Sequence, residues 1–107
     1  MRIKLYLDDI RELPNNSYIL VRSYNEAIQF IKDNGIPSFI SFDHDLGEDE
    51  FQNILPNGYD FAKWLVEMDM ENIYTFPNDF SFYVHSSNIV GKKNIESYLN
   101  NYLSLKK

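Results

Sequence analysis

The stretch Phe39-Ile40-Ser41-Phe42-Asp43-His44-Asp45-Leu46-Gly47 joins a short apolar run to two carboxylates, an imidazole and a glycine turn. An apolar run of this length, rich in aromatic and β-branched residues, indicates a buried strand. In open α/β sheets, ligands bind just beyond the carboxyl ends of the strands. We therefore predict that Asp43, His44 and Asp45 lie at a binding site.

Two other strand-like runs end in polar side chains of the same kind. The run 3–7 stops at Asp8 and Asp9, and the run 80–84 stops at His85-Ser86-Ser87-Asn88. The carboxyl ends of neighbouring parallel strands share one edge of a sheet. If these three strands are parallel and adjacent, three acidic side chains and two histidines converge at that edge.

The composition limits the class of protein. With 107 residues, 44% of them hydrophobic, we expect a single domain over residues 1–107. The chain has no Cys, and we find neither a signal peptide nor an apolar run that could span a membrane, so we expect a cytoplasmic protein without membrane association. Its net charge of −6 argues against general nucleic-acid binding. A small phosphorylated ligand remains compatible with this charge if a divalent cation neutralises the site.

The hydrophobic pattern predicts an α/β domain of three layers with a four-stranded, mainly parallel sheet. The first helix begins at a capping box formed by Ser23 and Glu26 and ends at Asn34-Gly35. Residues 46–57 form a long acidic loop, and a loop of this length beside a candidate site is typical of a functional segment. The predicted strands are 3–7, 18–21, 38–42 and 80–84, and the later helices are about 58–69, capped by Asn57, and 90–104.

The connection between the first two strands, residues 8–17, is too short for a packed helix. An extended chain covers about 3.3 Å per residue, which is enough to return along a short strand. We therefore predict a parallel pair without a crossover helix. An antiparallel second strand is the alternative.

Asp8, Asp9 and Asp43 are candidate ligands for one divalent cation. Carboxylate oxygens suit Mg²⁺ or Mn²⁺ better than Zn²⁺. Repulsion between three clustered carboxylates also opposes their convergence unless a cation is present. The alternative is that Asp8 and Asp9 simply end a strand as turn residues.

The two histidines are candidates for proton transfer, because the ordinary pKa of an imidazole, near 6.5, allows it to act as acid or base. We favour His85 as the acid, since it leads directly into a polar turn, whereas His44 could orient Asp43 and Asp45. Either histidine could instead only hydrogen-bond a neighbouring backbone carbonyl. Asp45 is open to three interpretations: metal ligand, base or loop residue.

Candidate phosphate-binding groups precede or open the last helix. The free amides of a helix N-terminus attract anions, and a nearby Lys adds positive charge. Ser87 or Asn88 could equally serve only as the helix N-cap. The candidates are Ser86, Ser87, Asn88 and Lys92, together with Arg11 after the first strand.

Four motifs in order resemble the cyclic-phosphate-processing receiver-like family, and the match runs nearly end to end. They are Leu5-Tyr6-Leu7-Asp8-Asp9-Ile10-Arg11, Ser41 to Gly47, Asn57-Gly58-Tyr59-Asp60, and His85-Ser86-Ser87-Asn88 with Gly91. The resemblance implies a truncated receiver, or flavodoxin-like, topology and hydrolysis of nucleotide-derived cyclic phosphates. It also implies that Asp8 and Asp9 hold a metal, that Asp43 receives phosphoryl groups and that Ser86 contacts them.

The chain departs from receivers in two respects, which bear on its function. We expect it to lack the fifth strand and that strand's phosphate-binding Lys, and it adds His44, Asp45 and His85. The sequence therefore favours a Mg²⁺-dependent phosphoesterase that acts on a small nucleotide-derived phosphate. The alternatives are a receiver-like switch that accepts phosphate or binds a partner, and a module that sequesters nucleotides. Asp43 and Asp45 also resemble the acidic pair of topoisomerase-primase domains. This interpretation ranks last, because those domains place a Glu after their first strand and this sequence has none there.

Overall fold

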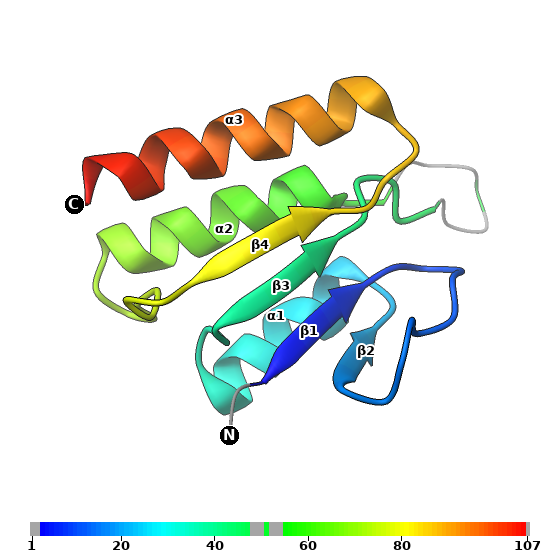
Figure 1. Ribbon diagram of the computed structural model, residues 1–107, viewed down its shortest axis with the longest axis horizontal. Helices are drawn as coiled ribbons and strands as arrows, with labels where there is room; N and C mark the ends of the chain where they lie inside the picture. The colour runs from blue at the N-terminus through cyan, green and yellow to red at the C-terminus, as the bar shows by residue number, and fades with distance from the viewer. Residues whose placement is uncertain (1–2, 48–50, 52–54, 107) are drawn as a thin grey trace.

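The computed structural model describes residues 3–47, 51 and 55–106. The strands are β1 (Lys4–Leu7), β2 (Tyr18–Val21), β3 (Phe39–Phe42) and β4 (Ser81–Val84), and the helices are α1 (Tyr24–Asn34), α2 (Gly58–Met70) and α3 (Ile89–Leu105). Figure 1 shows these elements in chain order. The predicted elements are all present, with bounds that shift by one or two residues. The acidic residues 48–50 of the predicted functional loop lie outside the described residues.

All three strand pairs are parallel, and the strand order is β2-β1-β3-β4. The predicted parallel pairing of the first two strands is therefore confirmed, and no described helix connects them. The first helix is capped by Ser23, whose side chain accepts from the Glu26 N–H. In a capping box the Glu26 carboxylate would also accept from the Ser23 N–H. Here it accepts instead from the N–H of Arg22, the residue before Ser23.

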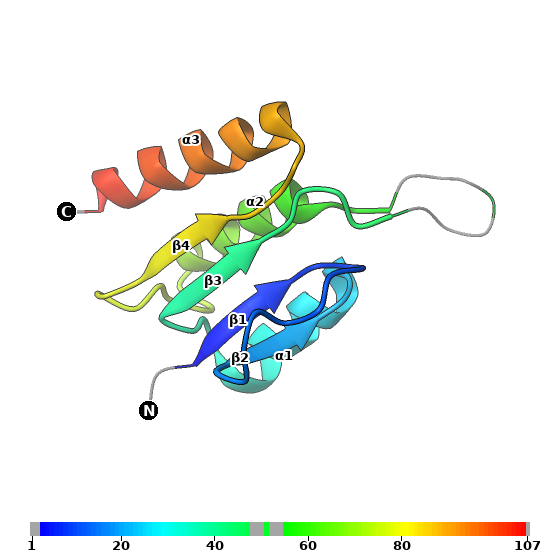
Figure 2. The same cartoon turned by 45° about the vertical axis from the view of Figure 1, so that its right-hand side comes forward.

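The helices lie on one face of the sheet, which corrects the prediction of three layers to two (Figures 1 and 2). Crossovers between parallel strands are right-handed. The connections β2-α1-β3 and β3-α2-β4 both step in the same direction across the sheet, so their helices reach the same face. The connection from β1 to β2 steps the opposite way, and a helix there would have covered the other face.

One hydrophobic core lies between the sheet and the helices. Leu5, Ile40 and Phe42 point from the strands into this core, where α2 packs against both α1 and α3. The alternate strand residues, among them Tyr6, Ser41 and Tyr83, face the side of the sheet that carries none of the described helices. We call this side the open face. Among the described residues, no helix combines the length and the apolarity needed to cross a bilayer.

Candidate functional site

The strand register places three polar side chains in one row. Leu7, Phe42 and Val84 pair across β1, β3 and β4, so the next residues are Asp8, Asp43 and His85. Backbone hydrogen bonds continue the ladder through this row, from the Asp43 N–H to the Leu7 carbonyl and from the His85 N–H to the Phe42 carbonyl. Because side chains alternate along a strand, this row points to the same side as Tyr6, Ser41 and Tyr83.

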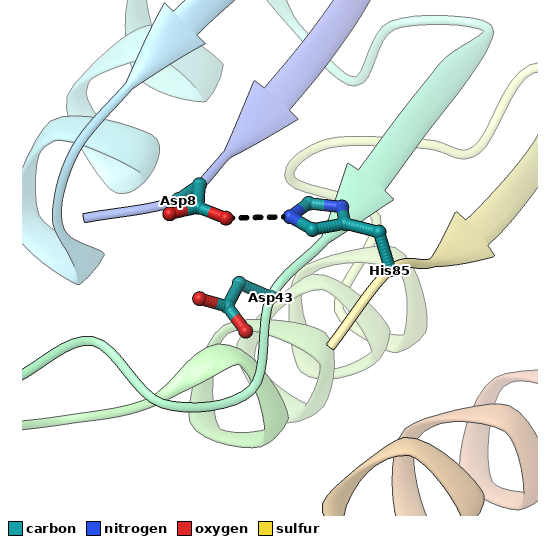
Figure 3. Close-up of side chains that lie close together, drawn as sticks. All are labelled: Asp8, Asp43 and His85. Atoms are coloured by element: carbon teal, nitrogen blue, oxygen red, sulfur yellow. Dashed lines mark hydrogen bonds and ion pairs between the residues drawn. The ribbon is translucent and has the colours of Figure 1, made fainter. Parts of the chain in front are cut away.

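Asp8, Asp43 and His85 form a compact cluster, shown in Figure 3. Each offers one potential metal-ligating atom, and these atoms all lie within 4.8 Å of one another. Asp9, the third carboxylate of the predicted metal site, falls outside this group. It follows Asp8 by one position, and its Oδ2 lies 3.2 Å from where a Cβ would stand on Gly47. The structure thus joins two of the three predicted ligands and adds a histidine.

The Asp8 carboxylate is fully buried and heavily hydrogen-bonded. Its Oδ1 accepts from the backbone N–H groups of Ile10 and Arg11 at 2.9 and 2.8 Å, and its Oδ2 lies 2.9 Å from His85 Nε2. Burial alone would raise the pKa of Asp8, but the N–H groups of Arg11 and Ile10 and the His85 ring outweigh burial and lower the pKa below its ordinary value. Asp8 is therefore charged at neutral pH and anchors the chain after β1.

His85 is held on both ring nitrogens. Its Nδ1 lies 2.7 Å from Ser41 Oγ, its Nε2 bonds Asp8, and the ring stacks on Tyr6 at 4.3 Å between centroids. Burial lowers the pKa of His85, and the hydrogen bond to Asp8 offsets this decrease only in part. We infer the neutral tautomer in which Nε2–H donates to Asp8 and Nδ1 accepts from the Ser41 hydroxyl.

Asp43 has the opposite electrostatic character to Asp8. Burial and the charge of Asp8 raise the pKa of Asp43, and a hydrogen bond from the Ser86 side chain offsets this increase only in part. The Asp43 Oδ1 also accepts from the His44 N–H at 2.9 Å. The raised pKa expresses the cost of burying a carboxylate and of placing it beside the charge of Asp8, and a cation would reduce that cost.

Two predicted phosphate-binding residues, Arg11 and Ser86, lie at the cluster. Arg11 Nη1 donates to the His85 carbonyl at 2.8 Å, and its Nε lies 3.7 Å from Asp8 Oδ2. The Arg11 side chain is 48% exposed, so it borders solvent at the cluster. Ser86 contacts Asp43 and also accepts from the Asn88 N–H at 3.1 Å.

His44, Asp45 and Asn88 form a second group next to the cluster. His44 Nδ1 lies 2.9 Å from Asp45 Oδ1, and Asn88 Nδ2 lies 3.3 Å from both Asp45 carboxylate oxygens. Asn88 is also the N-cap of α3, since its side chain accepts from the Gly91 N–H. A Cβ on Gly91 would stand 2.3 Å from His44 Cγ, so only glycine lets the imidazole lie against the helix.

The remaining predicted phosphate ligands are Lys92 and Ser87. Lys92 Nζ sits over the Tyr83 ring, 5.3 Å from its centroid, and Ser87 is exposed. Sequence reasoning also missed Ser41 and Tyr6, which hold the His85 ring. The position of Ser41 inside an apolar strand could have indicated this contact, because a buried hydroxyl needs a hydrogen-bonding partner.

Fold and site together define a receiver-like parallel α/β domain with an acidic cluster at the carboxyl ends of its strands. A family model described as "Cyclic-phosphate processing Receiver domain" matches residues 3–101. The chain therefore belongs to this family, as its motifs suggested. Searches among curated proteins and among solved structures returned no match.

The tautomer and the pKa of His85 can be tested by nuclear magnetic resonance of the ring nitrogens. We expect a neutral ring with its proton on Nε2 and a pKa below the ordinary 6.5. Ser41→Ala should raise that pKa, because the Ser41 hydroxyl stabilises the neutral form, whereas Ser104→Ala on α3 should leave it unchanged. Because the folded pKa is lowered, the contribution of His85 to stability is present above pH 6.5 and is lost as the pH falls through the folded pKa. Titration of His85 at or above 6.5 would contradict this assignment.

Proposed function

We propose that this protein is a Mg²⁺- or Mn²⁺-dependent phosphoesterase that acts on a small nucleotide-derived phosphate, cyclic or linear. The observation that carries the proposal is the convergence of Asp8, Asp43 and His85 beside Arg11, in a chain that belongs to a cyclic-phosphate-processing family. An acidic pair next to a partly exposed guanidinium suits a phosphate that arrives with a divalent cation. The absence of Cys supports a cytoplasmic location.

The residues present fit a divalent cation. Asp43 and Asp8 would hold it, since their carboxylates are close and the pKa of Asp43 is raised by burial and by the charge of Asp8. Hard oxygen donors are the ligands that Mg²⁺ and Mn²⁺ prefer, and an imidazole in the same group is compatible with Mn²⁺. A bound cation would neutralise phosphate charge and polarise the phosphorus centre. Asp43 is the better ligand of the two, because the oxygens of Asp8 already accept three hydrogen bonds.

Each side chain of the site receives a role in this proposal. Asp43 attacks the phosphorus or positions a water molecule, and the guanidinium of Arg11 holds the non-bridging oxygens. His85, bonded on both nitrogens, positions Asp8 instead of donating a proton. His44 becomes the better acid, because Asp45 holds its Nδ1 and leaves Nε2 to carry the proton to the leaving oxygen.

The proposal is tested by turnover of a panel of cyclic and linear nucleotide phosphates, with and without Mg²⁺. We expect hydrolysis of at least one cyclic phosphate, loss of activity in EDTA, and recovery on addition of Mg²⁺ or Mn²⁺. His44→Ala should then reduce turnover by about 10²–10⁴-fold with little change in Mg²⁺ affinity, as expected for loss of a general acid. Full activity in His44→Ala on every hydrolysed substrate would remove His44 from the mechanism.

A phosphate-accepting switch is the second candidate, favoured by the contact between Ser86 and Asp43. A switch of this kind needs a metal, an aspartate and a hydroxyl but no imidazole. If the wild type hydrolyses no member of the panel and is labelled on Asp43 by acetyl phosphate, the switch replaces the esterase.

A further inference from the structure

Arg22 directly follows β2, at the edge of the sheet that carries the acidic cluster. Val21 pairs with Leu7 in the parallel ladder, and the Asp8 N–H donates to the Val21 carbonyl at 3.1 Å. The residue after β2 therefore lies beside Asp8, a member of the cluster. Arg22 is half-buried there, and its guanidinium is a second one at this edge, after that of Arg11.

The guanidinium of Arg22 bonds to the main chain of residues 8–11, which we call the 8–11 segment. Its Nη1 donates to the Arg11 carbonyl at 2.8 Å and, more distantly, to the Asp8 carbonyl at 3.5 Å. These carbonyls belong to the last and first residues of the segment, so one guanidinium spans it from end to end. Arg22 is itself held at its backbone, because its N–H donates to the Glu26 carboxylate at 3.0 Å.

Little apolar packing fixes the 8–11 segment. Ile10 is 78% exposed, and the hydrophobic core of the described residues contains no side chain from residues 9–17. Figure 1 shows this connection running outward from the end of β1 before it returns to the start of β2. A segment with few buried apolar contacts opens easily, so its polar contacts decide how firmly it is held.

The 8–11 segment carries two side chains that the proposed function uses. The Asp8 Oδ1 accepts from the N–H groups of Ile10 and Arg11, so the position of the Asp8 carboxylate and the conformation of the segment depend on each other. The Arg11 guanidinium donates to the His85 carbonyl and lies beside the Asp8 carboxylate. A shift of the Arg11 main chain would therefore displace the guanidinium from the cluster.

We propose that Arg22 is a positioning residue, whose bonds to the carbonyls of Arg11 and Asp8 hold Arg11 where it binds phosphate. The inference rests on the proposed function, in which Arg11 holds the non-bridging oxygens. Arginine suits this task because its planar guanidinium offers several donors in a fixed geometry, whereas the ammonium of lysine is a compact charge on a flexible stem. Because Nη1 of Arg22 already donates to two main-chain carbonyls, its contacts favour positioning over direct phosphate binding.

Backbone order parameters from ¹⁵N relaxation of the full chain test the positioning without any ligand. We expect values near the rigid limit of about 0.85 at Ile10 and Arg11 in the wild type, falling to about 0.6 or below in Arg22→Met. Lys32→Met is the matched control, because it removes the same charge from an exposed position on α1, and it should leave both values unchanged. Leu65 in α2 should stay rigid in all variants, since these order parameters report fast local motion and not global stability.

A double-mutant cycle on phosphate binding shows whether Arg22 acts through Arg11. The probe is inorganic phosphate in the presence of Mg²⁺, titrated into the wild type, the two single variants Arg22→Met and Arg11→Met, and the double variant. We expect Arg22→Met to raise the phosphate Kd roughly tenfold or more in the wild type, the factor for losing a hydrogen bond to a charged group. It should have no further effect in the Arg11→Met background, because the group that it positions is already gone.

Arg22→Lys keeps the charge but not the fork of donors, so it should give intermediate order and intermediate affinity. It provides the same comparisons if Arg22→Met does not fold. Unchanged order at Ile10 and Arg11, or an equal loss of affinity in both backgrounds, would overturn the proposal, and the second result would mean that Arg22 binds phosphate directly. If the wild type binds no phosphate with Mg²⁺, the proposed function loses its anion site, and the order parameters still support or overturn the role of Arg22.

Discussion

Replacing Asp43 with Asn is expected to abolish turnover and, at the same time, to raise the melting temperature of the cation-free domain. The two effects have one cause. Burial and the neighbouring charge of Asp8 raise the pKa of Asp43, so the charged form that the proposed chemistry needs is unfavourable in the folded state. An amide keeps the shape and the acceptor oxygen for the His44 N–H but removes the charge.

The loss of activity should be at least about 10²–10⁴-fold, the range for removal of a group that takes part directly in the transition state. Because the folded pKa is raised, ionisation of Asp43 costs stability once the pH exceeds the ordinary 3.8. The stabilisation by Asp43→Asn should therefore be present at neutral pH without metal and disappear below pH 3.8, where the wild-type carboxyl is protonated. Thermal melts across this range, paired with the turnover assay, measure both effects.

Asp33→Asn is the matched control, because Asp33 is exposed on α1 and bonds only a neighbouring side chain, Gln29, on the same helix. It should change neither turnover nor melting temperature appreciably. An Asp43→Asn variant that melts lower than the wild type would show that Asp43 stabilises the fold, and its loss of activity would then have a structural explanation. Opposite signs for activity and stability are the signature of a functional carboxylate.

Asp69→Ala is expected to be the most destabilising single substitution that we propose. Asp69 is buried near the end of α2 and accepts from the Phe76 N–H at 2.9 Å. It also accepts from Tyr102 Oη at 2.5 Å and from Lys106 Nζ at 2.7 and 2.8 Å. The carboxylate thus joins α2, the connection that precedes β4, and the end of α3.

Removal of Asp69 leaves the Phe76 N–H without its acceptor and Lys106 without its counter-charge. We expect the free energy of unfolding to fall by about 3 kcal/mol. This value is at the lower end of the range for breaking a buried ion pair, because Lys106 is partly exposed. Tyr102→Phe, which deletes one bond to a charged acceptor, should cost about 1.5–3 kcal/mol. Asp33→Ala should stay within about 0.5 kcal/mol of the wild type, as expected for a surface position. Urea denaturation at neutral pH measures all three.

The pH dependence of these variants identifies the ionic network. Burial opposes ionisation of Asp69, but bonds from Lys106, Tyr102 and the Phe76 N–H lower its pKa. The stabilisation by Asp69 is therefore present above pH 3.8 and is lost as the pH falls through the lower folded pKa. The difference in the free energy of unfolding between wild type and Asp69→Ala should decrease over the same range. Burial and the bond to Asp69 raise the pKa of Tyr102 to about 12, so its contribution is lost as the pH rises from 10 toward 12. If the differences in the free energy of unfolding between wild type and these variants stay constant in both the acidic and the alkaline range, the ionic network is contradicted.

Local sequence determined the elements of this protein and their order. Short apolar runs separated by polar loops indicated the strands, and the cap residues Ser23, Asn57 and Asn88 mark the helix starts that the structure contains. The length of the 8–17 connection, which leaves no room for a packed helix, also led correctly to a parallel first pair. These features depend on residues close together in the chain, so they can be derived without knowledge of long-range contacts.

The sequence also indicated that the polar residues after three strands meet at one edge, and Asp8, Asp43 and His85 do so. It did not determine which neighbours join them. Asp9 and His44 each follow a member of the cluster by one position, yet neither belongs to the group of metal-ligating atoms. Choosing the correct member of each pair requires the register between strands that are far apart in the sequence.

Tertiary structure alone decided the layers of the domain and the state of His85. The number of layers follows from the direction in which each crossover steps, and that direction depends on the strand order β2-β1-β3-β4. His85 is neutral and bonded on both nitrogens because Ser41 and Asp8, from two other strand segments, reach its ring. The protonation of a buried side chain depends on its desolvation and its partners, and both exist only once distant segments have packed together.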